Sequence, residues 1–224
     1  MLFAEATPSV KALVLMAPAG AMAAPLPCFE GSFSSATDLS SAAQCTPTES
    51  GFYAPTGGTQ QAACSPGTVA PNVRMGVCDK CAAGTYQDEP GKLSCKPCEA
   101  GSFCPEAASA ALPCHEGSYA TATNLTSAAE CTQTDPGHFA PTGSTHQTEC
   151  SPGTVAPNAS MGACNKCVAG TYQQEPGQLE CKPCEQGSYC PEGSARPIGC
   201  PAGRFINVTG AADETACMLA PNGT

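Results

Sequence analysis

Apolar positions in this chain recur in short bursts that follow cysteines. Nine times a cysteine begins the pattern Cys-x-x-Gly-x-(Phe, Tyr or Val), as in Cys81-Ala-Ala-Gly84-Thr-Tyr86. The glycine permits a positive φ directly after the cysteine, and the aromatic or β-branched residue favours the start of a short strand. Turn residues such as Glu89-Pro90-Gly91 follow, and the next cysteine closes the loop. Each unit of about 17 residues therefore predicts a small hairpin that is tied at its base.

These units lie inside a longer repeat with a period of 86 residues. Between the matched segments 64–81 and 150–167, 14 of 18 positions are identical. Such self-similarity indicates tandem duplication and a solenoid-like architecture in which each unit packs mainly on its neighbours. The predicted organisation is a leader over 1–27, repeat 1 over 28–113, repeat 2 over 114–199, and the start of a truncated third repeat over 200–224.

One cross-link is missing from each repeat. Thr48 stands where an opening cysteine is expected and Gln61 where its closing cysteine is expected, and the second copy has Thr134 and Gln147 at these positions. If cysteines paired in sequence, this joint loss would delete one whole bridge. If pairing were interlaced, it would leave free thiols, which are a hazard in an oxidising compartment. Sequential pairing is therefore the better account.

Sequential pairing predicts nine disulfides: Cys28–Cys45, Cys64–Cys78, Cys81–Cys95, Cys98–Cys104, Cys114–Cys131, Cys150–Cys164, Cys167–Cys181, Cys184–Cys190 and Cys200–Cys217. The closing partner of Cys98 is displaced from the position that Ala111 holds. A Cys104–Cys114 bond is therefore an open alternative, and so is its equivalent in the second repeat.

The composition leaves little apolar material for an ordinary core. Leu, Ile, Val and Phe number 27 of 224 residues, Trp is absent, and Gly and Pro together number 45. A chain with few residues to bury and 18 cysteines is normally held by cross-links or metal. Closing a loop of ~15 residues contributes roughly 3 kcal/mol in the chain-entropy model. The predicted fold class is therefore a small disulfide-rich, β-hairpin and irregular fold, arranged as an elongated tandem-repeat rod without a central core.

The charge and the N-terminal segment bear on partners and location. The net charge is −10 with nine basic residues spread thinly, so no basic stripe predicts binding of nucleic acid. Residues 1–27 lack cysteine, and Lys11 precedes the apolar stretch 12–17, which is compatible with a signal peptide or with a disordered leader. No stretch reaches the ~20 apolar residues of a membrane span. We expect an extracellular or cell-surface location through the secretory pathway.

The segment 78–98, with the sequence CDKCAAGTYQDEPGKLSCKPC, resembles the cysteine-rich ephrin-receptor-like repeat. That family is distantly similar to the loop modules of tumour-necrosis-factor-receptor ectodomains and to the cysteine-rich regions of growth-factor receptors. The segment 187–203 is similar to repeats of large protist surface proteins. The resemblance covers about residues 28–217 and implies a spacer or a binding surface, because such repeats serve both roles in unrelated proteins.

Sharper chemical interpretations compete with this one. Cys78, Cys81, Cys95 and Cys98 have the Cys-x2-Cys-x13-Cys-x2-Cys spacing of a tetrahedral zinc site, and the second repeat has the same spacing from Cys164 to Cys184. The ten cysteines outside these two segments do not form sets of four. All eighteen cysteines, however, fall into pairs of an opening and a closing cysteine. The Cys-x-x-Cys motifs have no thioredoxin-like context.

No catalytic residue, cofactor or metal ligand is predicted, so we expect no enzymatic activity. The three histidines, His115, His138 and His146, align with Phe29, Phe52 and Gln60 of the first copy, so the repeat does not need imidazole there. The aromatic residues of the hairpins are expected mainly to cover the disulfide of the adjacent loop, although they could line a ligand surface.

Four sequons make Asn124, Asn158, Asn207 and Asn222 candidates for glycosylation. The predicted function is a non-catalytic extracellular or cell-surface array that acts as a structural spacer or as a stalk that binds a protein or a glycan. The alternative is a zinc-binding protein that uses the two segments with four-cysteine spacing as its metal sites.

Overall fold

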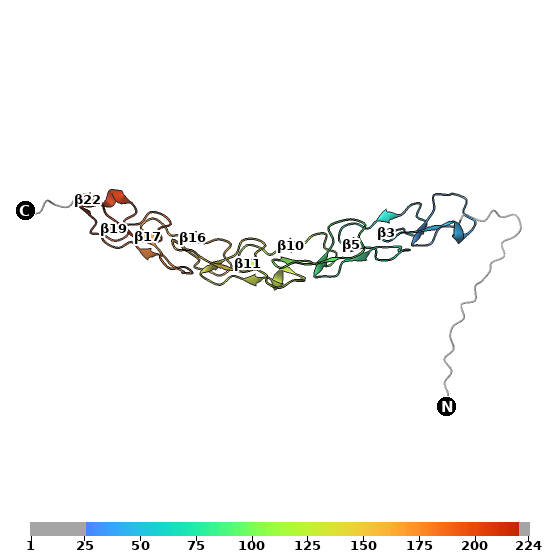
Figure 1. The fold of residues 1–224 in the computed structure, drawn as a ribbon, viewed down its shortest axis with the longest axis horizontal. Helices are drawn as coiled ribbons and strands as arrows, with labels where there is room; N and C mark the ends of the chain where they lie inside the picture. The colour runs from blue at the N-terminus through green and yellow to red at the C-terminus, as the bar shows by residue number, and fades with distance from the viewer. Residues whose placement is uncertain (1–25, 220–224) are drawn as a thin grey trace, which may run out of the picture.

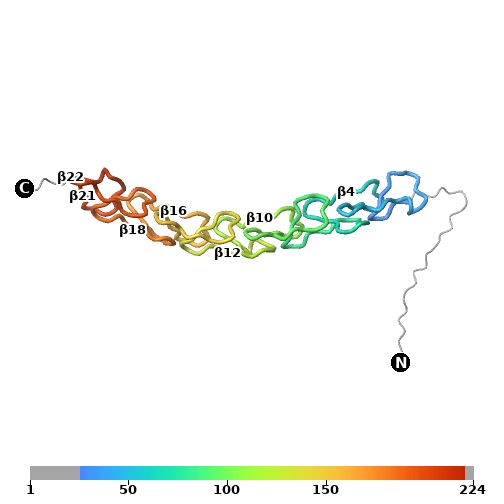
Figure 2. The backbone as a smooth tube through the Cα atoms, viewed as in Figure 1, coloured from blue at the N-terminus to red at the C-terminus, as the bar shows by residue number. Residues whose placement is uncertain are grey.

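The computed structural model describes residues 26–219, which form a long, gently curved rod (Figure 1). Eleven separate two-stranded antiparallel sheets follow one another in chain order, and the smooth tube of Figure 2 passes through them from one end of the rod to the other. Each sheet is a hairpin of two strands with two residues each. The predicted disulfide-rich hairpin-repeat fold is therefore confirmed. Most of the predicted leader, residues 1–25, lies outside the described residues.

We number the hairpins 1 to 11 along the chain. The first five are β1 (Ser32–Phe33) with β2 (Thr46–Pro47), β3 (Phe52–Tyr53) with β4 (Ala62–Ala63), β5 (Thr68–Val69) with β6 (Asp79–Lys80), β7 (Thr85–Tyr86) with β8 (Lys96–Pro97), and β9 (Ser102–Phe103) with β10 (Leu112–Pro113). The other six are β11 (Ser118–Tyr119) with β12 (Thr132–Gln133), β13 (His138–Phe139) with β14 (Thr148–Glu149), β15 (Thr154–Val155) with β16 (Asn165–Lys166), β17 (Thr171–Tyr172) with β18 (Lys182–Pro183), β19 (Ser188–Tyr189) with β20 (Ile198–Gly199), and β21 (Arg204–Phe205) with β22 (Met218–Leu219).

Hairpins 1, 6 and 11 have longer loops than the others, and each loop contains one turn of 3-10 helix. These turns are η1 (Ala42–Gln44), η2 (Ala128–Glu130) and η3 (Glu214–Ala216). In each case the residue that ends the turn is the closing cysteine of that hairpin. In these three hairpins the 3-10 turn thus returns the longer loop to its closing cysteine.

Backbone hydrogen bonds join each hairpin to the next. At the junction of hairpins 4 and 5, the Gly84 N–H donates to the Cys104 carbonyl at 2.8 Å and the Gln87 N–H to the Ala108 carbonyl at 3.1 Å. In the other direction, the Ala107 N–H donates to the Cys81 carbonyl at 2.8 Å, and the Cys98 N–H donates to the Gly84 carbonyl at 2.9 Å. The same four bonds recur at all ten junctions. The stacking is therefore specified by the backbone.

The glycine that follows each opening position is held at positive φ, and in hairpins 1 to 9 it lies against two hairpins at once. Gly84 has a φ of +86°, donates its N–H to hairpin 5, and lies so close to hairpin 6 that an added Cβ would be 2.6 Å from the Asn124 carbonyl oxygen. A Cβ does not fit at that distance. This contact extends the packing of hairpins 1 to 9 beyond the nearest neighbour to the second hairpin along the rod.

The buried side chains form small separate clusters along the rod. Tyr86 of hairpin 4 packs against the Cys98–Cys104 disulfide of hairpin 5, and Phe103 packs against the cluster around Cys114. Tyr172 of hairpin 9 packs against the Cys184–Cys190 disulfide of hairpin 10, and Tyr189 of hairpin 10 packs against the cluster around Cys217 of hairpin 11. For these four aromatic residues, the expectation that they cover the disulfide of the adjacent loop is confirmed.

The first prediction concerns the shape in solution. Because each hairpin contacts only its near neighbours, the oxidised protein should have a radius of gyration clearly above the ~17 Å of a compact chain of this length. Small-angle X-ray scattering should give a distance distribution that is skewed to long vectors, and reduction should broaden it toward that of a coil. A value near 17 Å that survives reducing agent would contradict the rod.

A second prediction compares two glycines at the same position of the 86-residue repeat. Gly101 and Gly187 have φ values of +80° and +81°, so alanine costs each about 1–2 kcal/mol in backbone strain. A Cβ at Gly101 would lie 2.3 Å from the Gly143 carbonyl oxygen, whereas a Cβ at Gly187 meets no described atom within 4 Å. Gly101→Ala should therefore cost a further 1–3 kcal/mol, roughly, through overpacking.

Hydrogen exchange of the Gly143 N–H, which donates to the Cys114 carbonyl at 2.9 Å, should report this difference. Exchange should accelerate in Gly101→Ala because hairpin 7 can no longer dock fully on its neighbours. It should stay unchanged in Gly187→Ala. Equal effects of the two substitutions would mean that the close approach does not determine the stacking.

Candidate functional site

All eighteen cysteines are paired, and the bonds join the partners that sequential pairing predicts. They are Cys28–Cys45, Cys64–Cys78, Cys81–Cys95, Cys98–Cys104, Cys114–Cys131, Cys150–Cys164, Cys167–Cys181, Cys184–Cys190 and Cys200–Cys217. The Cα–Cα distances lie between 5.7 and 6.0 Å, within the usual range for a disulfide. Hairpins 2 and 7 have no cross-link, as the positions of Thr and Gln predict.

The displaced bond in hairpin 5 has a clear local cause. Cys104 is the residue that directly follows strand β9, and its side chain is fully buried. The equivalent position in hairpin 3 is Ala70, which is also fully buried. Cys104 therefore occupies an interior position that faces Cys98, while Ala111 packs against the same cluster. The alternative Cys104–Cys114 bond is absent, since Cys114 pairs with Cys131.

The pairing argues against the zinc alternative. Each Cys-x2-Cys segment contains the closing cysteine of one hairpin and the opening cysteine of the next, and both sulfurs are already in disulfides. A zinc ion needs thiolate ligands, which a disulfide does not supply. Within residues 26–219, no three His, Cys, Asp or Glu side chains are placed to hold a metal ion together.

The three histidines lie on the surface of two hairpins. His115 and His146 are exposed, and His138 on β13 is half-buried. The His138 Nε2 lies 3.9 Å from the Glu149 carboxylate of the opposite strand. This cross-strand pair is the expected environment of a solvated histidine, and it offers no nucleophile for a base to activate.

The charged side chains form exposed ion pairs along the rod. Lys96 donates to Asp88 at 2.6 Å, and this hydrogen bond is the main cause that lowers the pKa of Asp88. The Lys80–Glu106 pair at 2.8 Å lowers the pKa of Glu106 in the same way and joins hairpin 3 to hairpin 5. These carboxylates are therefore charged at neutral pH and solvated, which is unsuited to general acid catalysis.

Tyr172 is the buried aromatic side chain whose hydroxyl contacts a charged residue. Burial raises the pKa of this hydroxyl, and a hydrogen bond to the Glu185 carboxylate at 3.2 Å raises it further. The side chain is only 6% exposed and packs against the Cys184–Cys190 disulfide. Its protonated hydroxyl therefore joins hairpins 9 and 10, which is a structural role.

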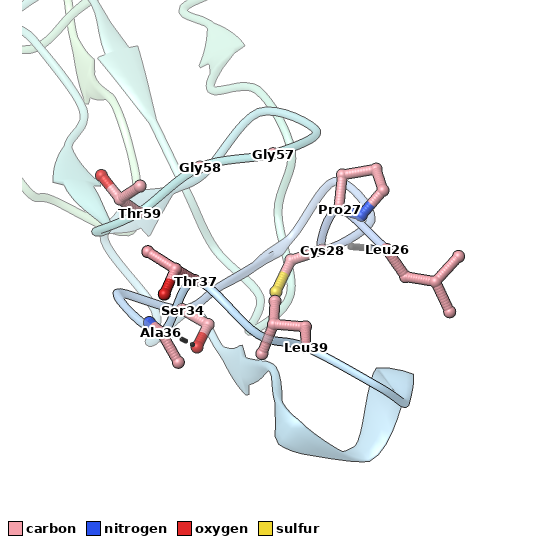
Figure 3. A pocket seen from close by; sticks show the side chains of 10 residues that line it. All are labelled: Leu26, Pro27, Cys28, Ser34, Ala36, Thr37, Leu39, Gly57, Gly58 and Thr59. Atoms are coloured by element: carbon pink, nitrogen blue, oxygen red, sulfur yellow. Dashed lines mark hydrogen bonds between the residues drawn. The ribbon is translucent and has the colours of Figure 1, made fainter. Parts of the chain in front are cut away.

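A pocket of about 200 Å³ lies between hairpin 1 and the loop of hairpin 2 (Figure 3). The lining residues are Leu26, Pro27, Cys28, Ser34, Ala36, Thr37, Leu39, Gly57, Gly58 and Thr59. Their side chains are small or aliphatic, the Ala36 N–H donates to the Ser34 hydroxyl at 3.3 Å, and the Cys28 sulfur is in a disulfide. The pocket thus offers no ionisable group for catalysis.

Three of the four sequon asparagines are exposed in the structure: Asn124, Asn158 and Asn207. The fourth, Asn222, lies outside the described residues. Asn124 has a φ of +61°, and its backbone N–H donates to the Cys98 carbonyl at 2.8 Å. Its backbone is therefore part of a junction, whereas its side chain is accessible from solvent.

Comparison with known proteins assigns no family to this chain. No family model matches it. A segment of 107 residues is 31% identical to part of a protein named ABC transporter G family member 28 from Arabidopsis thaliana. The match covers 47% of this chain and 9% of the length of that protein. Within the described residues, no helix is long and apolar enough to cross a membrane.

The third prediction tests the cross-links directly. Protein made in an oxidising compartment should show no reactive thiol when denatured, and peptide mapping without reductant should recover the Cys98–Cys104 and Cys184–Cys190 loops. Elemental analysis should find no stoichiometric metal. Two zinc ions per chain together with eight reactive thiols would contradict the disulfide account.

Proposed function

We propose that this chain is a non-catalytic, extracellular or cell-surface spacer that holds what lies at its two ends apart. The observation that carries the proposal is the repeated junction. Every hairpin is fixed to the next by the same four backbone hydrogen bonds, and in hairpins 1 to 9 the glycine after the opening residue packs against the hairpin beyond, as Gly84 does. A rod built in this way holds whatever is attached to its two ends at a fixed distance.

The cross-links support an extracellular location. Disulfides persist in oxidising compartments and are rare in the cytosol, and this chain has nine of them. With so few apolar residues, the fold depends on the bonds being formed. A secreted or surface-exposed location therefore suits the physical requirements of the protein.

The sides of the rod can carry binding surfaces or glycans. We propose the exposed asparagines 124, 158 and 207 as attachment sites for N-linked glycans, since a sequon in a surface loop of a secreted protein is an acceptor. A protein or glycan partner would bind to these sides, because the backbone groups between hairpins are already occupied by one another.

The local pattern also supports membership of the ephrin-receptor-like class of cysteine-rich repeats. The segment from Cys78 to Cys98 carries the resemblance, and in the rod it spans the closing cysteine of hairpin 3, all of hairpin 4 and the opening of hairpin 5. Repeats of this kind serve as spacers in otherwise unrelated proteins, which agrees with the proposed role.

The fourth prediction is a measurement of end-to-end distance. Spectroscopic labels introduced by non-cysteine chemistry at Thr37 and Val208, both exposed positions of the terminal hairpins, should give one long and narrow distance distribution. Reduction should make it broad, because the loops then lose their closure. A short or multimodal distribution in the oxidised protein would contradict the spacer.

A control addresses the role of imidazole. His138→Ala and His146→Ala should change neither the distance distribution nor the binding of any partner that is found, because both side chains lie at the surface away from the junctions. A catalytic activity of the natural protein that either substitution abolished would overturn the non-catalytic assignment.

A further inference from the structure

The nine disulfides divide the chain into closed loops and open spans. A closed loop cannot lengthen when its two ends are pulled, because the covalent S–S bond bears the tension. Only the segments between one disulfide loop and the next can extend. From Cys28 to Cys217, two open spans have 18 residues, two have nine and four have two; they are 46–63 and 132–149, 105–113 and 191–199, and 79–80, 96–97, 165–166 and 182–183.

The two long spans coincide with hairpins 2 and 7, which we call the unbridged hairpins. Thr48 lies four residues before β3 and Gln61 directly before β4. In hairpin 1, Cys28 and Cys45 have the same positions relative to β1 and β2. Thr48 and Gln61 therefore occupy the two ends of the place where a disulfide lies in the seven hairpins that are tied at their base.

Hydrogen bonds replace the missing disulfide. The buried Thr48 hydroxyl, 1% exposed, accepts from the Met75 N–H of hairpin 3 at 3.0 Å. The Gln61 side-chain oxygen accepts from the Glu49 N–H at 2.9 Å and so joins the base of hairpin 2. The unbridged hairpin therefore has the same strand pairing as the bridged ones, and its base is held by interactions that break and form again reversibly.

Hairpin 7 repeats this arrangement with one addition. The Thr134 hydroxyl accepts from the Met161 N–H at 3.1 Å, and the Gln147 side-chain oxygen accepts from the Asp135 N–H at 2.8 Å. The Gln147 side-chain amide also donates to the Asp135 carboxylate at 2.8 Å. The same polar base has thus been formed in both repeats, at equivalent positions.

The two spans of nine residues, 105–113 and 191–199, are held differently. In hairpin 5 the Cys98–Cys104 bond closes a loop before the turn, so strand β10 lies outside the cross-link. Ala111 packs against the buried sulfurs at this place. The nine residues from 105 to 113 can therefore extend, but they release about half the length that an unbridged hairpin releases.

From this layout we infer that hairpins 2 and 7 are the main points at which the rod lengthens reversibly under tension, with smaller extensions at 105–113 and 191–199, while the disulfide loops stay closed. This inference rests on the proposed spacer function, since a spacer between two attached bodies is subject to pulling. The flanking disulfides remain closed and keep the register of the chain. Each unbridged hairpin can then refold in place when the tension ends.

Single-molecule pulling on the full oxidised chain, through handles fused to its two ends, tests the inference. The path from Cys45 to Cys64 can extend to at most ~65 Å, and the path from Cys104 to Cys114 to at most ~35 Å. We expect two long and two short gains in contour length within these limits. Gains of other lengths, or a single cooperative extension, would overturn the inference.

The double substitution Thr48→Cys and Gln61→Cys is the matched variant. The seven disulfides that tie a hairpin base have Cα–Cα distances of 5.7 to 6.0 Å, so cysteines at these equivalent positions should pair. Once mass spectrometry has verified the new bond, one of the two long gains should disappear. Thr134→Cys with Gln147→Cys should remove the other. Persistence of both long gains in a molecule with the verified bond would overturn the inference.

A single substitution keeps the inference testable if the new bond does not form. Thr48→Val removes the acceptor of the Met75 N–H, so one long gain should occur at a lower force and with unchanged length. No change in either long gain would count against the role of hairpin 2. The length gains and the zero-force distance distribution are separate readouts, so failure of this inference and failure of the spacer function are distinguishable.

Discussion

The structure depends on how closely the backbones of successive hairpins approach one another. In hairpins 1 to 9 the glycine after the opening residue donates to the next hairpin and also lies close to the second one along the rod. A Cβ at Gly117, for example, would be 2.0 Å from the Ser160 carbonyl oxygen. Side chains cannot fill such a contact, so the buried residues are mostly cysteine and alanine. A typical intramolecular hydrogen bond contributes only about 0.5–1.5 kcal/mol net, yet four of them recur at every junction. Backbone hydrogen bonds between hairpins thus stabilise the rod as a hydrophobic core stabilises a globular domain.

This close approach places demands on the loop that provides the facing carbonyl. The loop residue concerned has a positive φ in hairpins 2 to 11, and at most of these positions it is glycine. Ala107 and Asn124 have the same conformation, although their equivalents in the second repeat are Gly193 and Gly210. A non-glycine residue in this region costs roughly 1–2 kcal/mol. The chain tolerates this cost because the disulfides limit the entropy of the unfolded state and the junction bonds on both sides determine the loop conformation.

Much of this arrangement can be predicted from the sequence, and there is a physical reason why the other features cannot. The Cys-x-x-Gly-x-(Phe, Tyr or Val) pattern marks the opening of nine hairpins, and a Thr with a Gln marks the other two, because side-chain identity determines where a hairpin can be tied. The bonds between hairpins join backbone groups, which every residue possesses, so no side-chain pattern indicates them. The role of Thr48 is equally hidden. A threonine in place of the expected cysteine predicts that a bridge is lost. The hydrogen bond that the buried Thr48 hydroxyl accepts from the Met75 N–H cannot be predicted in this way, because it depends on the stacking of hairpin 3.

The same division between backbone and side chain explains how a rod of this kind can acquire specificity. Four positions differ between the matched segments 64–81 and 150–167: 73, 74, 77 and 79 in the first copy. All four are exposed in both copies. Arg74 and its equivalent Ser160 even share a positive φ and the same junction bond, so a change of charge at the surface leaves the stacking intact. Because the junctions use backbone groups, the sides of the rod can diverge without a loss of length or stiffness. Under the proposed function, recognition by a partner would therefore reside in exposed side chains that the fold does not need, and changes in those side chains would leave the backbone junctions unaltered.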